Sequence, residues 1–280
     1  MKFNHTKYKQ MNIKIWNEIA PRYHKRWASE NEGPFQSTSK LIELVNVKKG
    51  DYVLDLACGT GVVTKKISDK VGNSGFVIGA DASVTAIKIA KKWNRLKCNL
   101  DFVNMDAEKF CFSHKFDIVT CQYALFFFPD AQKALKNIRN NLKKTGIIGI
   151  SVHGHKDKVP FFSNILDVVT KFIPNYVPTN SPDLDRFGTK DALYNEVRNA
   201  GFSKILIRNF TYSYSPGRFD DYWKNYLKYI AKPLKEKINS LNISKRKELK
   251  QMIKQNTIPY TKKNGIIIFP WQVLILTAKY

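Results

Sequence analysis

The chain has 280 residues, of which 43% are hydrophobic and 13% aromatic, a composition typical of a globular protein with a well-buried core. Its 47 lysines and arginines exceed its 23 acidic residues, so the formal net charge is +24. Such an excess indicates an anionic partner (nucleic acid, an acidic substrate or a membrane surface), or it reflects lysines spread along the chain without a common role.

The N-terminal region is predicted to be helical. Apolar residues recur at spacings of three and four over residues 6–20, which predicts an amphipathic helix that stops near Pro21. After a polar loop over residues 31–34, the segment 38–47 is predicted to form a second helix.

Short, nearly continuous apolar strands then alternate with helices as far as residue 154. The predicted strands are 52–57, 76–81, 100–106, 116–122 and 146–154. The predicted helices between them are 61–70, 83–93 and 130–143. This alternation is typical of a doubly wound α/β fold, in which helices cover both faces of a parallel sheet.

The C-terminal part supplies two more strands and several helices. The strands are predicted over 203–212 and 271–280, and the helices over 160–173 and 189–200. Residues 219–256 are mostly helical in pattern and form an insertion before the last strand. The complete expectation is a Rossmann-like, mostly parallel seven-stranded sheet.

Cysteine spacing and hydropathy indicate the compartment. Four cysteines with no Cys-x-x-Cys pair argue against a zinc site, a redox pair or a disulfide scaffold. The N-terminus, MKFNHTKYKQMN, has no apolar core typical of a signal peptide. The longest apolar runs fall short of the roughly 20 residues that a membrane span needs. We therefore expect a soluble, cytoplasmic protein without a metal site.

The turn after the first predicted strand, in YVLDLACGTGVVT (52–64), is the first candidate site. In an open α/β sheet, ligands bind at the carboxyl ends of strands where the strand order reverses. Gly59 and Gly61 allow the backbone to pass close to a ligand. The turn lacks the Lys-Ser/Thr of a P-loop, and Thr64 stands where a dinucleotide fingerprint has its third glycine.

Polar residues also end the next predicted strands. Asp81 ends the second, where it can accept hydrogen bonds from ribose hydroxyls or merely cap a helix. Asp106 ends the third and can accept from an exocyclic amine, beside the backbone N–H of Ala107. Gln122 ends the fourth, ahead of several large apolar residues. With Asp55 in the first strand, these residues predict a nucleoside site that has no phosphate-binding element.

With these motifs, the chain resembles the class I S-adenosylmethionine-dependent methyltransferases, in the group that includes the ubiquinone/menaquinone-biosynthesis C-methyltransferases. The resemblance covers roughly residues 50–155 and is carried, in order, by VLDLACGTG, VIGADAS, NMDAEKF, FDIVTCQYALFFFPD and LKKTGIIGISVHG. IWNEIAPRYHKRW resembles the lid helix of the quinone-methylating branch, and YTKKNGIIIFPWQVLILTAKY is similar to the last strand hairpin of many members. The implied organisation is a helical lid (1–47) and a cofactor-binding domain (48–280).

The resemblance implies S-adenosylmethionine as the cofactor and assigns it residues. Those at its amino-acid end would be Asp55, Ala57, Gly59 and Gly61. Asp81 would hold the ribose, and the adenine would lie against Asp106 and Ala107. Gln122 would lie near the methionine part, covered by Tyr23 of the lid. Two departures stand out: Ala57-Cys58 replaces the commoner Gly-Cys, and YALFFFPD is unusually aromatic, which implies an apolar acceptor pocket.

The acceptor is less well defined by the sequence. We expect a small apolar or aromatic molecule, such as a lipid quinone or its precursor. Residues 210–230 are rich in tyrosine, so the insertion 219–256 is predicted either to cover the acceptor or to pack on the sheet. His24, His153 and His155 are candidate bases, and none is assigned a catalytic role.

Two other functions stay open at this stage. An RNA methyltransferase would use the basic surface, although the chain lacks the Asn-Pro-Pro-Tyr-like motif of many base-methylating enzymes. A cofactor-binding protein without catalysis would carry the same motifs. Residues 228–255 hold nine lysines and arginines against Glu236 and Glu248, which indicates a solvated helix face or a contact with anionic lipid or RNA.

Overall fold

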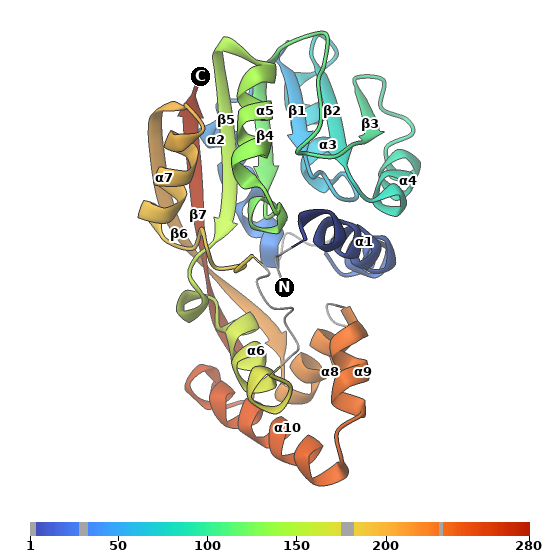
Figure 1. Ribbon diagram of the computed structural model, residues 1–280, viewed down its shortest axis with the longest axis vertical. Helices are drawn as coiled ribbons and strands as arrows, with labels where there is room; N and C mark the ends of the chain where they lie inside the picture. Colours follow the sequence, from blue (N-terminus) through green and yellow to red (C-terminus); the bar gives the residue numbers. More distant parts are fainter. Residues whose placement is uncertain (1–3, 28–32, 175–181, 230–231) are drawn as a thin grey trace. The chain divides into compact units, whose positions relative to one another are not determined.

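The computed structural model describes residues 4–27, 33–174, 182–229 and 232–280 (Figure 1). These residues form two compact units. The larger unit comprises the described residues of 4–153, 182–210 and 273–280. The smaller unit comprises the described residues of 154–174 and 211–272.

The N-terminal helix of the larger unit is longer than its sequence predicts. Helix α1 (His5–Trp27) continues through Pro21, so the predicted stop at that residue is wrong. A proline inside a helix removes one hydrogen bond and strains the preceding turn. Contacts beyond the proline compensate, because Trp27 is buried and His24 Nδ1 lies 2.8 Å from Thr60 Oγ1.

The predicted doubly wound sheet is confirmed. Its seven strands have the order β3-β2-β1-β4-β5-β7-β6. Their bounds are β1 Tyr52–Leu56, β2 Phe76–Asp81, β3 Leu100–Asn104, β4 Phe116–Gln122, β5 Leu142–His153, β6 Ser203–Gly217 and β7 Ile267–Lys279. The pairs β1–β2, β2–β3, β1–β4 and β4–β5 are parallel, and β5–β7 is antiparallel. The chain order reverses between β1 and β4, which makes their carboxyl ends the switch point of the sheet.

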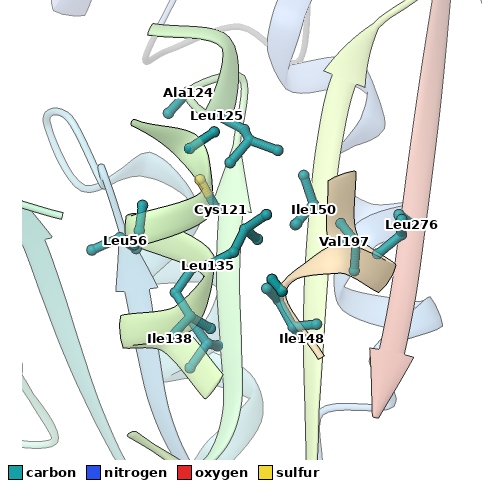
Figure 2. Packing of buried hydrophobic residues seen from close by; sticks show 14 of the residues in the cluster. Leu56, Cys121, Ala124, Leu125, Leu135, Ile138, Ile148, Ile150, Val197 and Leu276 are labelled. Carbon is teal, nitrogen blue, oxygen red and sulfur yellow. The ribbon is translucent and has the colours of Figure 1, made fainter. Parts of the chain in front are cut away.

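The core of the larger unit lies between the sheet and two helices on one of its faces. Figure 2 shows Leu135 and Ile138 of α5 (Ala131–Asn141) and Val197 of α7 (Lys190–Asn199) beside Ile148 and Ile150 of β5. All five side chains have no measurable exposure. They come from apolar positions at helical or strand spacing, so the sequence pattern itself places them on a common face.

Gly149 of β5 lies on the face of the sheet opposite α5. Because Ile148 and Ile150 point toward α5, Gly149 between them points away. A Cβ there would come within 2.3 Å of Val45 Cγ1, so glycine allows α2 (Thr38–Leu44) to pack closely on β5. Helix α3 (Val62–Val71) contacts β1 and β2, and α4 (Val84–Trp93) contacts β2 and β3.

The smaller unit has an aromatic core of its own. The Phe161 ring lies 5.2 Å from Tyr214, 5.4 Å from Tyr222 and 5.6 Å from Trp271, between ring centroids. The Tyr222 hydroxyl donates to the Phe161 carbonyl at 2.6 Å. Its helices are α6 Pro160–Phe172, α8 Phe219–Tyr229, α9 Lys232–Asn239 and α10 Ile243–Thr257. Among the described residues, no helix has the length and apolar character needed to span a membrane.

Candidate functional site

A cavity of about 170 Å³ lies in the larger unit at the switch point of the sheet. Its walls come from the residues that follow β1, β2, β3 and β4, and from α1. The predicted residues that line it are Tyr23, Asp55, Ala57, Gly59, Asp81, Asp106, Ala107 and Gln122. The fold therefore brings together eight predicted residues that are distant in sequence, as expected from their places near the carboxyl ends of the strands and on α1.

The turn after β1 is shaped by left-handed backbone. Ala57, Gly59 and Gly61 have φ values of 55°, 55° and 83°. A Cβ on Gly61 would lie 2.7 Å from Phe102 Cζ, so only glycine fits there. Gly61 does not line the cavity; it begins α3 and shapes the turn. Ala57 adopts a conformation that favours glycine, and such strained positions cluster at ligand sites.

Asp81 fixes the same turn from the end of β2. One carboxylate oxygen accepts the Gly59 N–H at 2.8 Å, and the other accepts the Ser83 N–H at 2.8 Å. Burial raises the pKa of Asp81, and the two N–H donors oppose this by stabilising the ionised form. The carboxylate thus both organises the glycine turn and borders the cavity.

Asp55 is almost fully buried and is held by two hydroxyls. Thr64 Oγ1 donates to it at 2.6 Å and Thr120 Oγ1 at 2.8 Å. Burial raises the pKa of Asp55 to about 6, although both threonine hydroxyls favour ionisation. Thr64 is the residue that replaces the third glycine of a dinucleotide motif, and its structural task is to hold this carboxyl group.

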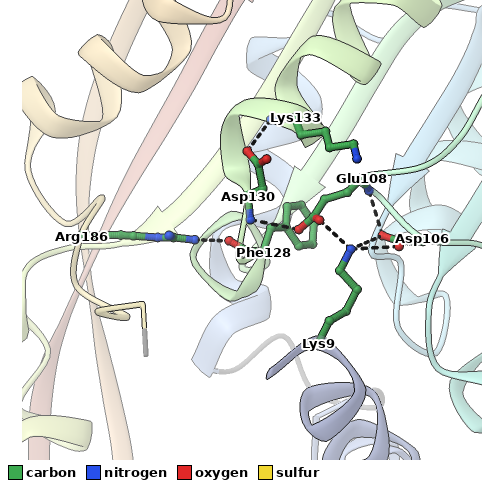
Figure 3. Close-up of polar contacts among 7 residues, drawn as sticks. All are labelled: Lys9, Asp106, Glu108, Phe128, Asp130, Lys133 and Arg186. Carbon is green, nitrogen blue, oxygen red and sulfur yellow. Dashed lines mark hydrogen bonds and ion pairs between the residues drawn. The ribbon is translucent and has the colours of Figure 1, made fainter. Parts of the chain in front are cut away.

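Asp106 belongs to a charged cluster that the sequence did not reveal (Figure 3). Lys9 Nζ from α1 donates to Asp106 at 2.9 Å and to Glu108 at 2.6 Å. Burial lowers the pKa of Lys9, but the bonds to Glu108 and Asp106 outweigh it and raise the pKa overall. Glu108 also accepts the Asp130 N–H at 3.0 Å, at the start of α5. The cluster ties α1 to the strand ends.

Aromatic side chains form a further part of the cavity lining. The ring of Trp16 in α1 packs edge-on against the rings of Tyr23 and Phe127, with 5.6 Å between ring centroids in each pair. Phe35 lies 6.0 Å from Tyr23. Burial raises the pKa of the Tyr23 hydroxyl far above its ordinary value, as does the neighbouring Tyr123, so Tyr23 is neutral. Phe127, Phe128 and Pro129 of the aromatic YALFFFPD segment all line the cavity.

Gln122 lines the cavity, whereas the candidate histidines do not. Gln122 Nε2 donates to Thr38 Oγ1 at 3.0 Å, so its amide also anchors α2. His24, His153 and His155 lie outside the cavity lining, as far as the described residues define it. His153 Nδ1 lies 3.7 Å from Asp185 Oδ1, and His155 Nδ1 lies 2.7 Å from Asp157 Oδ1.

A family model described as a methyltransferase domain matches residues 47–220. Demethylmenaquinone methyltransferase of Staphylococcus saprophyticus is 29% identical over 217 residues, covering 73% of this chain and 87% of that protein. Demethylmenaquinone methyltransferase of Lactobacillus johnsonii is 32% identical, covering 60% of this chain and 74% of that protein.

Solved structures share the fold at lower identity. The YcgJ protein of Bacillus subtilis superposes with a TM-score of 0.59 at 18% identity, covering 87% of this chain and 98% of that chain. Phosphoethanolamine N-methyltransferase 2 of Haemonchus contortus, in complex with S-adenosyl-L-methionine, gives a TM-score of 0.56 at 16% identity. That match covers 94% of this chain and 57% of the other.

Proposed function

Because the chain belongs to the methyltransferase domain family and is an S-adenosylmethionine-dependent enzyme, we propose that it methylates an aromatic quinone precursor. The observation that carries this proposal is that one cavity combines carboxylic acids with aromatic side chains in its lining. The relatives named demethylmenaquinone methyltransferase support the same acceptor class.

The charges around the cavity fit the cofactor. The lysine, aspartate and glutamate side chains of the lining are Lys9, Asp55, Asp81, Asp106 and Glu108. Their acidic excess disfavours a phosphate and favours a ligand that carries a sulfonium and an ammonium group. A nucleoside with two ribose hydroxyls and an amino group also matches an all-acceptor set of carboxylates.

We assign the individual residues on this basis. Asp81 holds the ribose, and Asp106 with the Ala107 N–H holds the adenine. The amino-acid end lies on the β1 turn at Asp55, Ala57 and Gly59, and Gly61 shapes that turn from outside the lining. Gln122 and Tyr23 border the methionine part. When bound, S-adenosylmethionine supplies an electrophilic methyl group on a leaving group that needs no protonation.

The aromatic side chains of the lining orient the acceptor and exclude water. Trp16, Tyr23 and Phe127 present rings that stack on a flat, apolar acceptor. The neutral Tyr23 hydroxyl can donate a hydrogen bond to an oxygen of that acceptor. Because the histidines lie outside the cavity lining, we assign no side chain as a general base.

The acceptor class is tested by methyl transfer from labelled cofactor. A reduced demethylmenaquinone with a short isoprenoid tail should become labelled, and the Asp81→Ala protein serves as the inactive control. RNA and protein fractions of a cell extract are counted in parallel. Label that enters RNA but never the quinone would overturn the proposed acceptor.

We further propose that the smaller unit contacts an anionic membrane from the cytoplasmic side. Ile243 and Ile258 are 79% and 65% exposed at the two ends of α10, and Lys247 and Lys254 lie exposed between them. Spacings of four, seven and four residues put these positions on one side of the helix. Cations flanked by exposed apolar side chains fit the surface of an anionic bilayer.

Vesicle sedimentation tests this contact. The protein should sediment with vesicles that contain phosphatidylglycerol and remain in solution with phosphatidylcholine alone. Lys247→Glu together with Lys254→Glu should abolish sedimentation. Lys40→Glu together with Lys91→Glu, which reverses two exposed lysines of the larger unit, serves as the control for net charge. Equal binding to both vesicle types would contradict the proposal, and salt-sensitive RNA binding that is lost in the same double variant would assign the surface to RNA.

A further inference from the structure

The wall of the cavity that follows β4 is built from irregular backbone. A 3₁₀ helix, η2 (Leu125–Phe127), is followed by Phe128 and Pro129 before α5 begins. Phe127, Phe128 and Pro129 line the cavity. Among the residues that the structure describes, only the Leu125 carbonyl of this short helix accepts a backbone N–H, that of Phe128 at 3.2 Å, so the positions of the following carbonyls depend on donors from elsewhere.

Arg186 supplies these donors. Its Nη2 group donates to the carbonyl oxygen of Phe128, and it approaches those of Phe126 and Leu125 at 3.3 and 3.4 Å. Figure 3 shows the guanidinium reaching the Phe128 carbonyl from the turn before α7. Its carbon atom lies 4.8 Å from the centre of the Phe187 ring, which supports the guanidinium plane from one side.

The partners of this arginine are unusual for a half-buried cation. Within the described residues, no carboxylate lies at ion-pair distance from Arg186. Burial lowers its pKa, with nearby acids giving only a partial offset. A charged group is therefore desolvated in order to hold backbone carbonyls, and a planar fork of donors suits that task better than an ammonium.

The far end of the same wall is fixed independently. Glu108 accepts the Asp130 N–H at 3.0 Å, and Glu108 is held by Lys9. Asp130 in turn caps α5 by accepting the Lys133 N–H at 2.9 Å. The segment 125–130 is thus held by Arg186 at its beginning and by the acidic cluster at its end.

We propose that Arg186 is a positioning residue that sets the aromatic wall for the acceptor. The proposal rests on the proposed acceptor class, an aromatic quinone precursor. Arg186 does not line the cavity, so it acts through the backbone that carries Phe127 and Phe128. The carboxylic acids of the lining lie on β1, on β2 and after β3, outside the segment that Arg186 holds, so loss of Arg186 should weaken acceptor binding and spare the cofactor.

The test compares Arg186→Met with a matched arginine. Arg139 Nε also donates to a backbone carbonyl, that of Gly201 at 2.9 Å, and its guanidinium lies 4.0 Å from the Tyr280 ring. The Gly201 carbonyl that Arg139 binds is not part of the cavity wall. Arg139→Met therefore removes the same kind of contact without touching the site.

For Arg186→Met we expect the KM for the reduced demethylmenaquinone to rise about tenfold, because a small misplacement of a binding wall weakens productive binding. The affinity for S-adenosylhomocysteine, measured by calorimetry, should stay within about twofold of the wild type. The rise in KM should be smaller in Arg186→Lys, since a lysine ammonium can hydrogen-bond to one of the three carbonyls but not to all of them. Arg139→Met should change neither quantity.

A measurement that needs no acceptor keeps the two proposals apart. Amide hydrogen exchange in a peptide covering residues 124–130 should accelerate in Arg186→Met and in Arg186→Lys, and stay unchanged in Arg139→Met. If no variant methylates the quinone, the acceptor proposal fails, while exchange still decides the role of Arg186. Unchanged exchange and KM, or an equal loss of S-adenosylhomocysteine affinity, would overturn the role.

Discussion

Replacing Asp81 with alanine removes the carboxylate that ends β2 and borders the cavity. An ionised carboxylate offers about four acceptor positions. The Gly59 and Ser83 N–H groups use one on each oxygen, which leaves room for two ribose hydroxyls. Hydrogen bonds to a charged group contribute about 1.5–3 kcal/mol each, so the loss of two predicts roughly a hundredfold to ten-thousandfold weaker cofactor binding.

Calorimetric titration with S-adenosylhomocysteine measures this loss directly. Asp81→Asn keeps the size of the side chain and one acceptor oxygen, so its affinity should fall between those of the wild type and Asp81→Ala. Asp101→Asn on the neighbouring strand, where Asp101 is exposed and pairs with Lys91 at 3.5 Å, should bind normally. A folded Asp81→Ala protein with wild-type affinity would refute the assignment of the ribose site.

Two further predictions concern stability. Burial raises the pKa of Asp55 to about 6 in the folded protein, whereas the pKa of an aspartate in the unfolded chain is about 4. The stability that the protonated Asp55 contributes is therefore fully present below about pH 4 and is lost as the pH rises through 6. The free energy of unfolding in urea should therefore fall by up to about 3 kcal/mol with rising pH in the wild type and should not show this fall in Asp55→Asn. The same dependence of the unfolding free energy on pH in both proteins would contradict this prediction. Trp271 is 1% exposed in the aromatic core, so Trp271→Ala should cost about 3–5 kcal/mol, whereas Leu96→Ala, at a residue 90% exposed, should change stability by less than about 0.5 kcal/mol.

The sheet could be predicted from the sequence because its information is local. Each strand is a short apolar run, each run is followed by a helical period, and the strand-end residues Asp55, Asp81 and Asp106 follow from that alternation. Parallel strands then bring these residues to one edge whatever the details of packing. Helix α1 shows the limit of local signals, since Pro21 predicts a stop that the burial of Trp27 overrides.

The remaining site residues depend on pairings between distant segments. Lys9 and Asp106 are 97 positions apart, and Arg186 and Phe128 are 58 apart. Neither pair leaves a periodic trace, because a lysine on a helix face and an arginine in a turn are ordinary surface residues in a sequence. Thr64 did carry a signal: its departure from the glycine of a dinucleotide motif corresponds to its bond with Asp55.

The tyrosine-rich segment 210–230 was predicted either as an acceptor cover or as a packing stripe. For Tyr222 and Tyr226 the packing role is clear, since both are buried and their rings lie 5.4 and 5.9 Å from Phe161 within the smaller unit. An aromatic run in a sequence does not tell whether its rings face a ligand or one another. The role of the insertion as a cover stays a prediction.

The positive charge of the chain and the negative charge of its cavity have different explanations. The chain carries a formal charge of +24, yet the cavity lining sets Lys9 against four acidic side chains, and Lys9 is already paired with two of them. A polyanionic substrate would have to bring its phosphates toward those carboxylates, which is unfavourable in a partly buried site of low dielectric. A cationic cofactor and a neutral aromatic ring meet no such barrier. The excess of lysine must therefore be explained by surfaces other than the cavity, and it does not by itself argue for methylation of RNA.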